Sequence, residues 1–425
     1  MKRCPECRRD YYDDSLSYCL ADGTTLVHGL SDDEAATAIL HEPLSERTQK
    51  PKNIGLRRAW LIAAPIALLS AVVVVYALFF RASPTFSGSF RDVSSPAYEY
   101  YLRGKLDAHS ENRDRNEKAI KILQDVVAAD PSFAPAYAEL ARAYSIQANY
   151  HAADAEKKKI YEDARLAVEK ALALDQNLAE GHFVRAAVMW THVESFPHEQ
   201  AIQSLKRAIA LEPNLPGAHH QLGVIYFHIG MLDKGQTEFE KTLSINPTDA
   251  MARFRIGLIH SHRAEYERAL AIFKTVPREV NPQVFDRSLA TVLFQLGRTE
   301  EASKIVDDFL AKSSDEGGNV TSVKAMLLAK AGKEREAEES IKRAIEIGQS
   351  FQHFHHTTYN IASAYALLGK PEEALKWLEF TADDGFPCYL LFENDANLNS
   401  LRKDQRFINF MTKMKQQWEH YQASL

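Results

Sequence analysis

An amphipathic block recurs along the C-terminal three quarters of the chain, and this self-similarity constrains the fold more than any other feature. Within each block, apolar residues recur at three- and four-residue spacing, which is the period of a helix. Each block has a small residue near its start and an apolar residue four positions later, and most copies end on a proline. The clearest copies are residues 117–131, 161–176, 198–213 and 232–247.

A second helical stretch follows each block, so the repeating unit is a pair of helices. Between Pro213 and Pro247, which close two successive blocks, the period is 34 residues. Small residues let two helices approach closely and large ones fill the space beside them, while proline cannot continue a helix. Because one pair cannot bury its apolar face alone, neighbouring pairs must stack. The sequence therefore predicts an all-α superhelical solenoid.

The unit at residues 216–249 resembles the tetratricopeptide repeat, a helix–turn–helix family of this period. The residues that carry the resemblance are Leu222, Gly223, Tyr226, Gly230, Gly235, Phe239 and Pro247. The next unit repeats the pattern with Ile256, Gly257, His260, Tyr266, Ala269 and Phe273. Later units are marked by "LGRTEEA", "AGKEREA" and "LGKPEEA". We predict a tetratricopeptide-repeat solenoid of about eight units at residues 96–390.

The C-terminal tail has a pattern of its own. Residues 395–407 read Asp-x-x-Leu-x-x-Leu-Arg-x-Asp-x-Arg-Phe, which resembles the ending of membrane-anchored repeat proteins common in soil bacteria. The resemblance implies that residues 391–425 form capping helices at the end of the solenoid.

An apolar run at residues 59–80 contains no charged residue, whereas 25% of the residues in the whole chain are charged. As a helix it would be roughly 33 Å long at about 1.5 Å per residue, enough to cross a hydrocarbon core of ~30 Å. A buried core helix and a cleaved signal peptide are the alternatives. The first rarely runs this long without a polar face, and the second fits badly behind a long polar segment. We predict one transmembrane helix at 59–80, between a flexible linker at 29–58 and a spacer at 81–95.

The charges that flank this run predict its orientation. Basic residues before it are Arg47, Lys50, Lys52, Arg57 and Arg58, whereas Arg81 and Arg91 follow it. The positive-inside rule places the N-terminus in the cytoplasm and the repeats across the membrane. We therefore expect a single-pass protein of the bacterial inner membrane with a periplasmic repeat domain.

Three of the four cysteines lie in the first nineteen residues, in a pattern that resembles a small zinc ribbon. Cys4 and Cys7 form a Cys-x-x-Cys knuckle, and Cys19 begins a second knuckle in which Asp22 replaces the last cysteine. Zinc takes about four such ligands in a tetrahedron, and carboxylate is an acceptable one. The fourth ligand could be Asp22, His28 or water, and a metal-free vestige is the alternative. A closed site of this kind at residues 1–28 would hold structural zinc; no other cofactor is expected.

The first helix of each unit lines the concave face in the tetratricopeptide family. This resemblance implies a partner-binding groove lined by Phe183, Trp190, His220, Val224, Phe227, Phe254, Leu258, Phe294 and Tyr359. Aromatic side chains in a concave surface suit a peptide partner, although packing between helices is an equal alternative for each residue. Some relatives grip a carboxylate with basic groove residues. Only Arg142 suits that role here, so we do not expect such a clamp.

Other features of the sequence point away from catalysis and from nucleic acid. The chain has no Gly-rich phosphate loop, no Gly-x-Ser-x-Gly and no His-Glu-x-x-His, so no enzyme activity and no small-molecule substrate are expected. The net charge of -6 gives no reason to expect a nucleic-acid partner. The histidines of the repeats, among them His353, His355 and His356, are interpreted as surface or groove-lining residues, because neighbours on a helix rarely share a metal.

Together these features predict a membrane-anchored scaffold or adaptor that binds a protein partner in the groove of a repeat solenoid. A transmembrane sensor is the alternative, in which the zinc-ribbon-like module is coupled to a signalling or transcription partner. A regulatory subunit of a separate enzyme is not distinguished from the scaffold by the sequence, because repeat solenoids share a fold and not a function.

Overall fold

The computed structural model of the 425-residue chain describes residues 2–3, 10–11, 27–28, 89–349 and 351–425. It divides the chain into two compact units, Met1–Phe79 and Phe80–Leu425. The predicted zinc ligands Cys4, Cys7, Cys19 and Asp22 lie outside the described residues, and so does the predicted transmembrane run at 59–80. Among the residues that are described, no helix is long and apolar enough to cross a membrane.

The N-terminal unit contains a small antiparallel sheet. Its strands are β1 (Lys2–Arg3), β2 (Asp10–Tyr11) and β3 (Val27–His28), in the order β2-β1-β3. Lys2 pairs with Tyr11 on one side and with His28 on the other. Strand β1 is therefore the central strand, and the predicted Cys-x-x-Cys lies in the sequence that joins it to β2.

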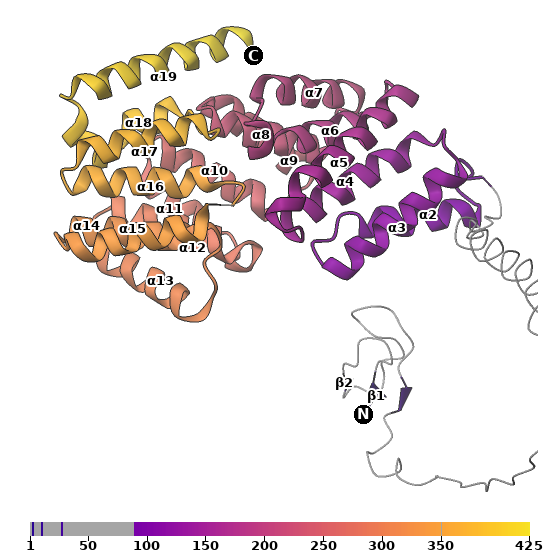
Figure 1. The fold of residues 1–425 in the computed structure, drawn as a ribbon, viewed down its shortest axis with the longest axis horizontal. Coiled ribbons are helices and arrows are strands. Elements are labelled where there is room, and N and C mark those ends of the chain that lie inside the picture. The colour runs from indigo at the N-terminus through magenta and orange to yellow at the C-terminus, as the bar shows by residue number, and fades with distance from the viewer. Residues whose placement is uncertain (1, 4–9, 12–26, 29–88, 350) are drawn as a thin grey trace, which may run out of the picture. The chain divides into compact units, whose positions relative to one another are not determined.

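The C-terminal unit is an array of helix pairs, shown in Figure 1 from purple to orange. The pairs are α2 (Pro96–Asp107) with α3 (Arg113–Ala129), α4 (Ala134–Tyr150) with α5 (Asp154–Leu174), α6 (Ala179–Met189) with α7 (His198–Leu211), α8 (Pro216–His228) with α9 (Leu232–Ile245), α10 (Ala250–His262) with α11 (Tyr266–Phe273), α12 (Pro282–Gln295) with α13 (Thr299–Lys312), α14 (Asn319–Lys330) with α15 (Glu334–Gly348), and α16 (Phe354–Leu367) with α17 (Pro371–Asp383). Short 3-10 turns are η1 (His192–Glu194), η2 (Arg278–Val280) and η3 (Glu316–Gly318). This is a tetratricopeptide-like all-helical solenoid, as predicted.

The helix boundaries follow from local capping chemistry. Asp249 accepts a hydrogen bond from the Ala252 amide at 2.8 Å and so begins α10, because a side-chain oxygen satisfies an amide that has no partner in the helix. Gly297 and Gly369 follow α12 and α16 with φ of 74° and 71°. That left-handed conformation ends a helix and suits glycine, which has no Cβ to clash.

The small and large residues of the repeat pack against each other inside each pair. A Cβ at Gly223 would lie 2.7 Å from the Phe239 ring, and one at Gly257 would lie 2.6 Å from the Phe273 ring. Phe239 and Phe273 are both fully buried. The phenylalanine of the second helix therefore fills the space that the glycine of the first helix leaves open.

After the last pair the chain returns along the solenoid as a C-terminal strap, which we define as residues 384–425. It contains α18 (Tyr389–Asn394), η4 (Ala396–Leu401) and α19 (Gln405–Ser424). The indole of Trp418 on α19 donates to the Gly230 carbonyl at 3.0 Å, and His420 lies 3.2 Å from Glu199. Figure 1 shows α19, in yellow, running past α17 and α18 toward α7 and α8. The tail does more than cap the last unit, because it also contacts helices in the middle of the array.

The Asp-x-x-Leu-x-x-Leu-Arg pattern of the tail builds the turns of the strap. Asp395 begins η4 by accepting from the Asn397 amide at 2.9 Å, and Asp404 begins α19 by accepting from the Arg406 amide at 2.8 Å. Leu398 and Leu401 are buried. Arg402 lies over the buried ring of Phe407 at 5.3 Å. Asp395 and Asp404 therefore serve as helix caps, and Leu398, Leu401 and Phe407 as core residues of the strap.

Candidate functional site

A groove of about 720 Å³ opens on the repeat unit. One wall comes from α4, α5, α6, α8 and α10, and the other from η3, the end of α15 and the residues before α16. Its volume is that of a typical site for a drug-sized ligand or a few residues of a peptide. The residues that give it chemical character are Tyr150, Tyr161, Trp190, His220, Arg255, Glu316, Phe351 and His353.

Two residues in this groove are available to a ligand. The ring of Tyr150 is 57% exposed, which is unusual for an aromatic side chain on a packed helix. The Nε atom of Arg255 is buried and has no hydrogen-bond partner. Burial lowers the pKa of Arg255 to about 10, so the guanidinium still carries its charge at neutral pH. The groove thus offers an exposed aromatic residue and a half-buried guanidinium, whose Nε is itself buried without a partner.

Three of the predicted groove residues line this groove, namely Trp190, His220 and Val224. His220 is half-buried, and Trp190 is buried. Phe183 is half-buried, with the Arg142 guanidinium 5.0 Å from its ring centre. Arg142 itself is engaged by Glu139 at 3.2 Å and by Glu180, so its charge is already paired.

The other predicted groove residues are buried inside the protein. Phe227, 1% exposed, stacks on His262 at 4.2 Å and lies 6.2 Å from Phe386 of the strap. Phe254 stacks on Phe273 at 5.0 Å. Leu258, Phe294 and Tyr359 are each at most 8% exposed. At these five positions the structure agrees with the alternative interpretation, that the residues pack between helices. The strap and the neighbouring helices cover the side chains that would otherwise line a groove.

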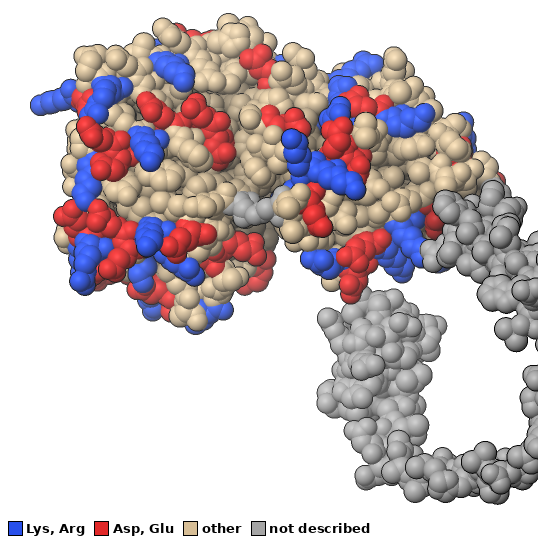
Figure 2. Space-filling model, in the orientation of Figure 1, with Lys and Arg blue, Asp and Glu red and all other residues tan. Residues whose placement is uncertain are grey.

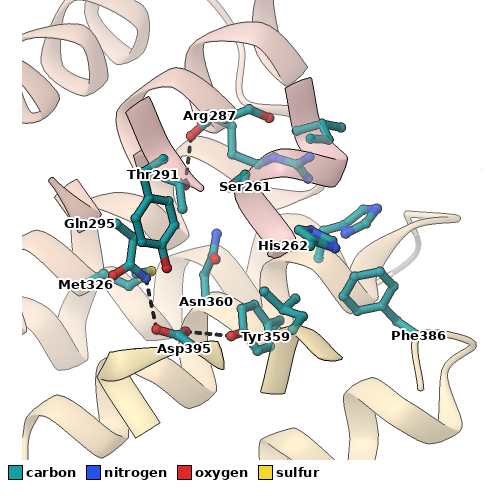
Figure 3. Close-up of a pocket in the computed structure, with 15 residues that line it drawn as sticks. Ser261, His262, Arg287, Thr291, Gln295, Met326, Tyr359, Asn360, Phe386 and Asp395 are labelled. Atoms are coloured by element: carbon teal, nitrogen blue, oxygen red, sulfur yellow. Dashed lines mark hydrogen bonds between the residues drawn. The ribbon is translucent and has the colours of Figure 1, made fainter. Parts of the chain in front are cut away.

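A second cavity, of about 70 Å³, lies where the strap covers α10, α12 and α16 (Figure 3). The carboxylate of Asp395 accepts hydrogen bonds there from Gln295 at 2.9 Å and from Tyr359 at 2.5 Å. Burial and this carboxylate raise the pKa of Tyr359 well above its ordinary value, so the phenol keeps its hydrogen. The space holds about two water molecules, so it is too small for a peptide.

Charged residues are mixed over the surface of the repeat unit. Figure 2 shows lysine and arginine interspersed with aspartate and glutamate on this face. Many form pairs between exposed side chains, such as Arg103 with Glu99 at 2.8 Å. Exposed pairs of this kind contribute little to the free energy of folding, so they favour solubility and do not determine the fold.

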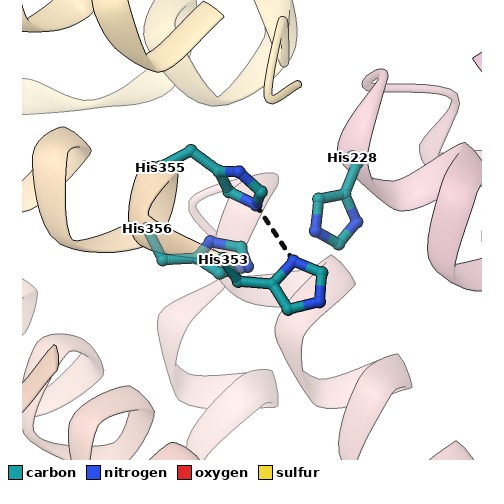
Figure 4. A group of neighbouring side chains, drawn as sticks. All are labelled: His228, His353, His355 and His356. Atoms are coloured by element: carbon teal, nitrogen blue, oxygen red, sulfur yellow. Dashed lines mark hydrogen bonds between the residues drawn. The ribbon is translucent and has the colours of Figure 1, made fainter. Parts of the chain in front are cut away.

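Sequence reasoning missed a group of four histidines. His228 ends α8, and His353, His355 and His356 lie at the start of α16, yet Figure 4 shows the four rings facing one another. The local pattern "HFHH" places three of them near each other in sequence. No local pattern indicates that His228, 125 residues earlier, lies beside them.

These features define a helical-repeat protein with a concave groove. A family model described as regulator of microtubule dynamics protein 1-3 matches residues 103–332, a little over half of the chain. The chain belongs to that family. No curated protein is similar enough to count as a match.

Several solved structures are similar to the chain at low sequence identity. A tetratricopeptide repeat protein from Parabacteroides merdae is 18% identical, with 64% of this chain and 97% of that chain covered and a TM-score of 0.45. Yeast Tom70 is 16% identical, with 86% and 74% covered and a TM-score of 0.40. YrrB, described as a tetratricopeptide repeat protein with an unusual peptide-binding site, is 22% identical, with 44% and 87% covered and a TM-score of 0.30.

Proposed function

We propose that the protein is a membrane-anchored scaffold that binds a short segment of a partner protein in the groove. The observation that carries the proposal is the exposed Tyr150 in the same groove as the half-buried, positively charged side chain of Arg255. Aromatic residues and arginine are the residues that most often dominate binding energy at protein interfaces. A partner segment with an apolar side chain and a neighbouring carboxylate would satisfy both groups.

The groove residues are tested by crosslinking the full chain in membranes and identifying partners by mass spectrometry. We expect Tyr150→Ala and Arg255→Gln each to reduce recovery of the main crosslinked partner at least tenfold. Leu166→Ala is the matched control, because Leu166 is 56% exposed and does not line the groove. Equal recovery from all three variants, with unchanged helical content, would show that the partner binds elsewhere.

Phe227 and Phe254 are unsuitable positions for this test. Each is at most 2% exposed, so a charged substitution would bury an unpaired charge and destabilise the protein whatever the groove does.

The membrane anchor rests on the apolar run at residues 59–80 and its basic flank. The proposed topology has a cytoplasmic N-terminus and periplasmic repeats at the bacterial inner membrane. A topology reporter fused after Leu425 should give a periplasmic signal; a cytoplasmic signal would contradict the proposal.

The proposed N-terminal zinc site consists of Cys4, Cys7, Cys19 and Asp22. Its support is the spacing of these residues, together with the antiparallel strands that flank them in sequence. Zinc that is lost in Cys4→Ser and reduced in Asp22→Ala would establish the ligand set. If Asp22→Ala keeps its zinc and His28→Ala loses it, His28 is the fourth ligand.

A second candidate function follows from the family. Its description names regulation of microtubule dynamics, so a cytoskeletal polymer is the alternative class of partner, and it requires the repeats to lie in the cytoplasm instead of the periplasm. Co-sedimentation of the detergent-solubilised full chain with microtubules tests this directly. Pelleting that Tyr150→Ala abolishes and Leu166→Ala preserves would support a polymer partner, and absence of pelleting would exclude it.

A further inference from the structure

The rings of His228, His353, His355 and His356 are arranged as four ligands around one point. Their ring centres lie between 4.7 and 6.1 Å apart in all six pairings. One nitrogen of each ring lies within 4.8 Å of a nitrogen of every other. A tetrahedral zinc ion with Zn–N of about 2.0–2.1 Å places ring centres about 5 Å apart, so the arrangement has the dimensions of a four-histidine metal site.

Two of the four imidazoles already have the tautomer that a metal requires. The Nδ1 of His228 lies 2.8 Å from the Val224 carbonyl, and the Nδ1 of His355 lies 2.7 Å from the Asp384 carbonyl. A carbonyl only accepts, so each Nδ1 must carry the hydrogen, and each neutral ring has its lone pair on Nε2. A backbone carbonyl on the far nitrogen is the usual partner that orients a metal-ligating histidine.

These lone pairs lack adequate donors in the protein. The Nε2 of His228 is buried and has no hydrogen-bond partner. The Nε2 of His355 lies 3.4 Å from the Nδ1 of His353 (Figure 4), a long separation for a hydrogen bond. The same separation is about the edge of a zinc-centred tetrahedron of nitrogens. A buried acceptor without a donor is costly, and a cation between the rings would satisfy it.

The surroundings keep three of the histidines neutral, which is the form that binds metal. Burial lowers the pKa of His228, His353 and His356 well below the ordinary value, and their mutual repulsion lowers it further. Trp190 and Phe386 pack against the rings and limit access of water. At neutral pH these three side chains therefore do not have to lose a proton before they bind an ion.

The charges near the group set a limit on its affinity. Arg255 and Arg287 each contribute a positive charge that disfavours a cation here. The carboxylate of Asp384, 3.5 Å from the Nδ1 of His355, acts in the opposite direction. Because the two arginines outnumber the carboxylate, we expect weaker binding than in a thiolate site, and selection for an ion that imidazole holds well.

We propose that His228, His353, His355 and His356 bind one divalent transition-metal ion, of which zinc is the test case. Imidazole ligands suit zinc, copper and nickel better than magnesium or calcium. The ion would link the end of α8 to the start of α16, and through the Asp384 carbonyl to the first residues of the strap. It would therefore stabilise the contact between the middle and the end of the repeat array.

The test separates this site from the proposed N-terminal one. The full-length Cys4→Ser/Cys7→Ser variant, stripped with a chelator, is titrated with Zn²⁺, and bound metal is measured by mass spectrometry. We expect about one ion per chain to remain, and the melting temperature to rise by ~5 °C at a hundredfold excess over Kd. Adding His228→Gln and His353→Gln should abolish both effects, whereas adding His109→Gln and His420→Gln, two exposed histidines, should preserve both.

A milder variant controls for loss of folding, and Co²⁺ distinguishes histidine ligands from cysteine ligands. His353→Gln alone changes a half-buried ring and should weaken Zn²⁺ binding at least tenfold while leaving helical content in chelator unchanged. Bound Co²⁺ should show visible bands without a thiolate charge-transfer band. If no ion remains once Cys4 and Cys7 are replaced, or if His353→Gln binds Zn²⁺ as the parent does, the proposal is wrong.

Discussion

Phe386 is the residue whose removal best tests the docking of the strap. Its ring is 1% exposed and stacks on His355 with the ring centres 5.5 Å apart. It also lies 5.8 Å from His262 and 6.2 Å from Phe227, both on helices of the middle units. One side chain thus connects the beginning of the strap to two helices more than a hundred residues away.

Phe386→Ala should lower the free energy of unfolding by about 3–4 kcal/mol. A buried phenylalanine removes roughly 150–250 Å² from water, and truncation to alanine in a core costs about 3–5 kcal/mol. We choose the lower part of this range because the neighbouring water-sized cavity allows some collapse. Phe380→Ala is the matched control; Phe380 is 44% exposed, so its truncation should cost less than about 1 kcal/mol.

Urea unfolding followed by circular dichroism gives the two free energies. Hydrogen exchange measured by mass spectrometry locates the effect, because repeat arrays need not unfold in one step. We expect faster exchange in α19 and at the end of α8 in Phe386→Ala and not in Phe380→Ala. Equal costs for the two variants, or unchanged exchange in α19, would refute the claim that Phe386 fastens the strap.

Two further predictions concern acid stability and helix packing. Burial lowers the pKa of His198 and His262 to about 3 from 6.5, so the unfolded chain binds more protons below pH 6.5. Each residue should therefore cost about 2 kcal/mol of stability between pH 7 and pH 5, and urea unfolding that is independent of pH over this range would contradict this. Gly257→Ala should destabilise the protein by about 1–2 kcal/mol, because overpacking against Phe273 outweighs the gain in helix propensity. Phe273→Leu should reduce that cost in a double-mutant cycle, and additive costs would show that the ring is not the cause.

The helix pairs could be predicted from the sequence because their contacts are local. Gly257 and Phe273 are sixteen residues apart and belong to one unit, so the same small-and-large pair recurs with the period of the repeat. The period of the apolar residues indicates which face of a helix is buried, and a turn rich in glycine or proline indicates where the helix ends.

The candidate site could be predicted only in part. Trp190, His220 and Val224, three of the residues predicted from the repeat pattern, lie along the groove. Phe227 and Phe254 come from the same pattern and do not line the groove, because they pack against other side chains of the protein. The pattern does not distinguish an apolar residue that lines a groove from one that is buried by another part of the same chain.

The class of fold and the repeating pairs follow from the sequence alone, because both depend on contacts between residues close together in the chain. The three-dimensional arrangement alone shows where the tail returns, which aromatic residues it covers and that His228 meets His353, His355 and His356. These contacts depend on the small rotation between successive pairs, which accumulates along the array and leaves no periodic signal in the sequence.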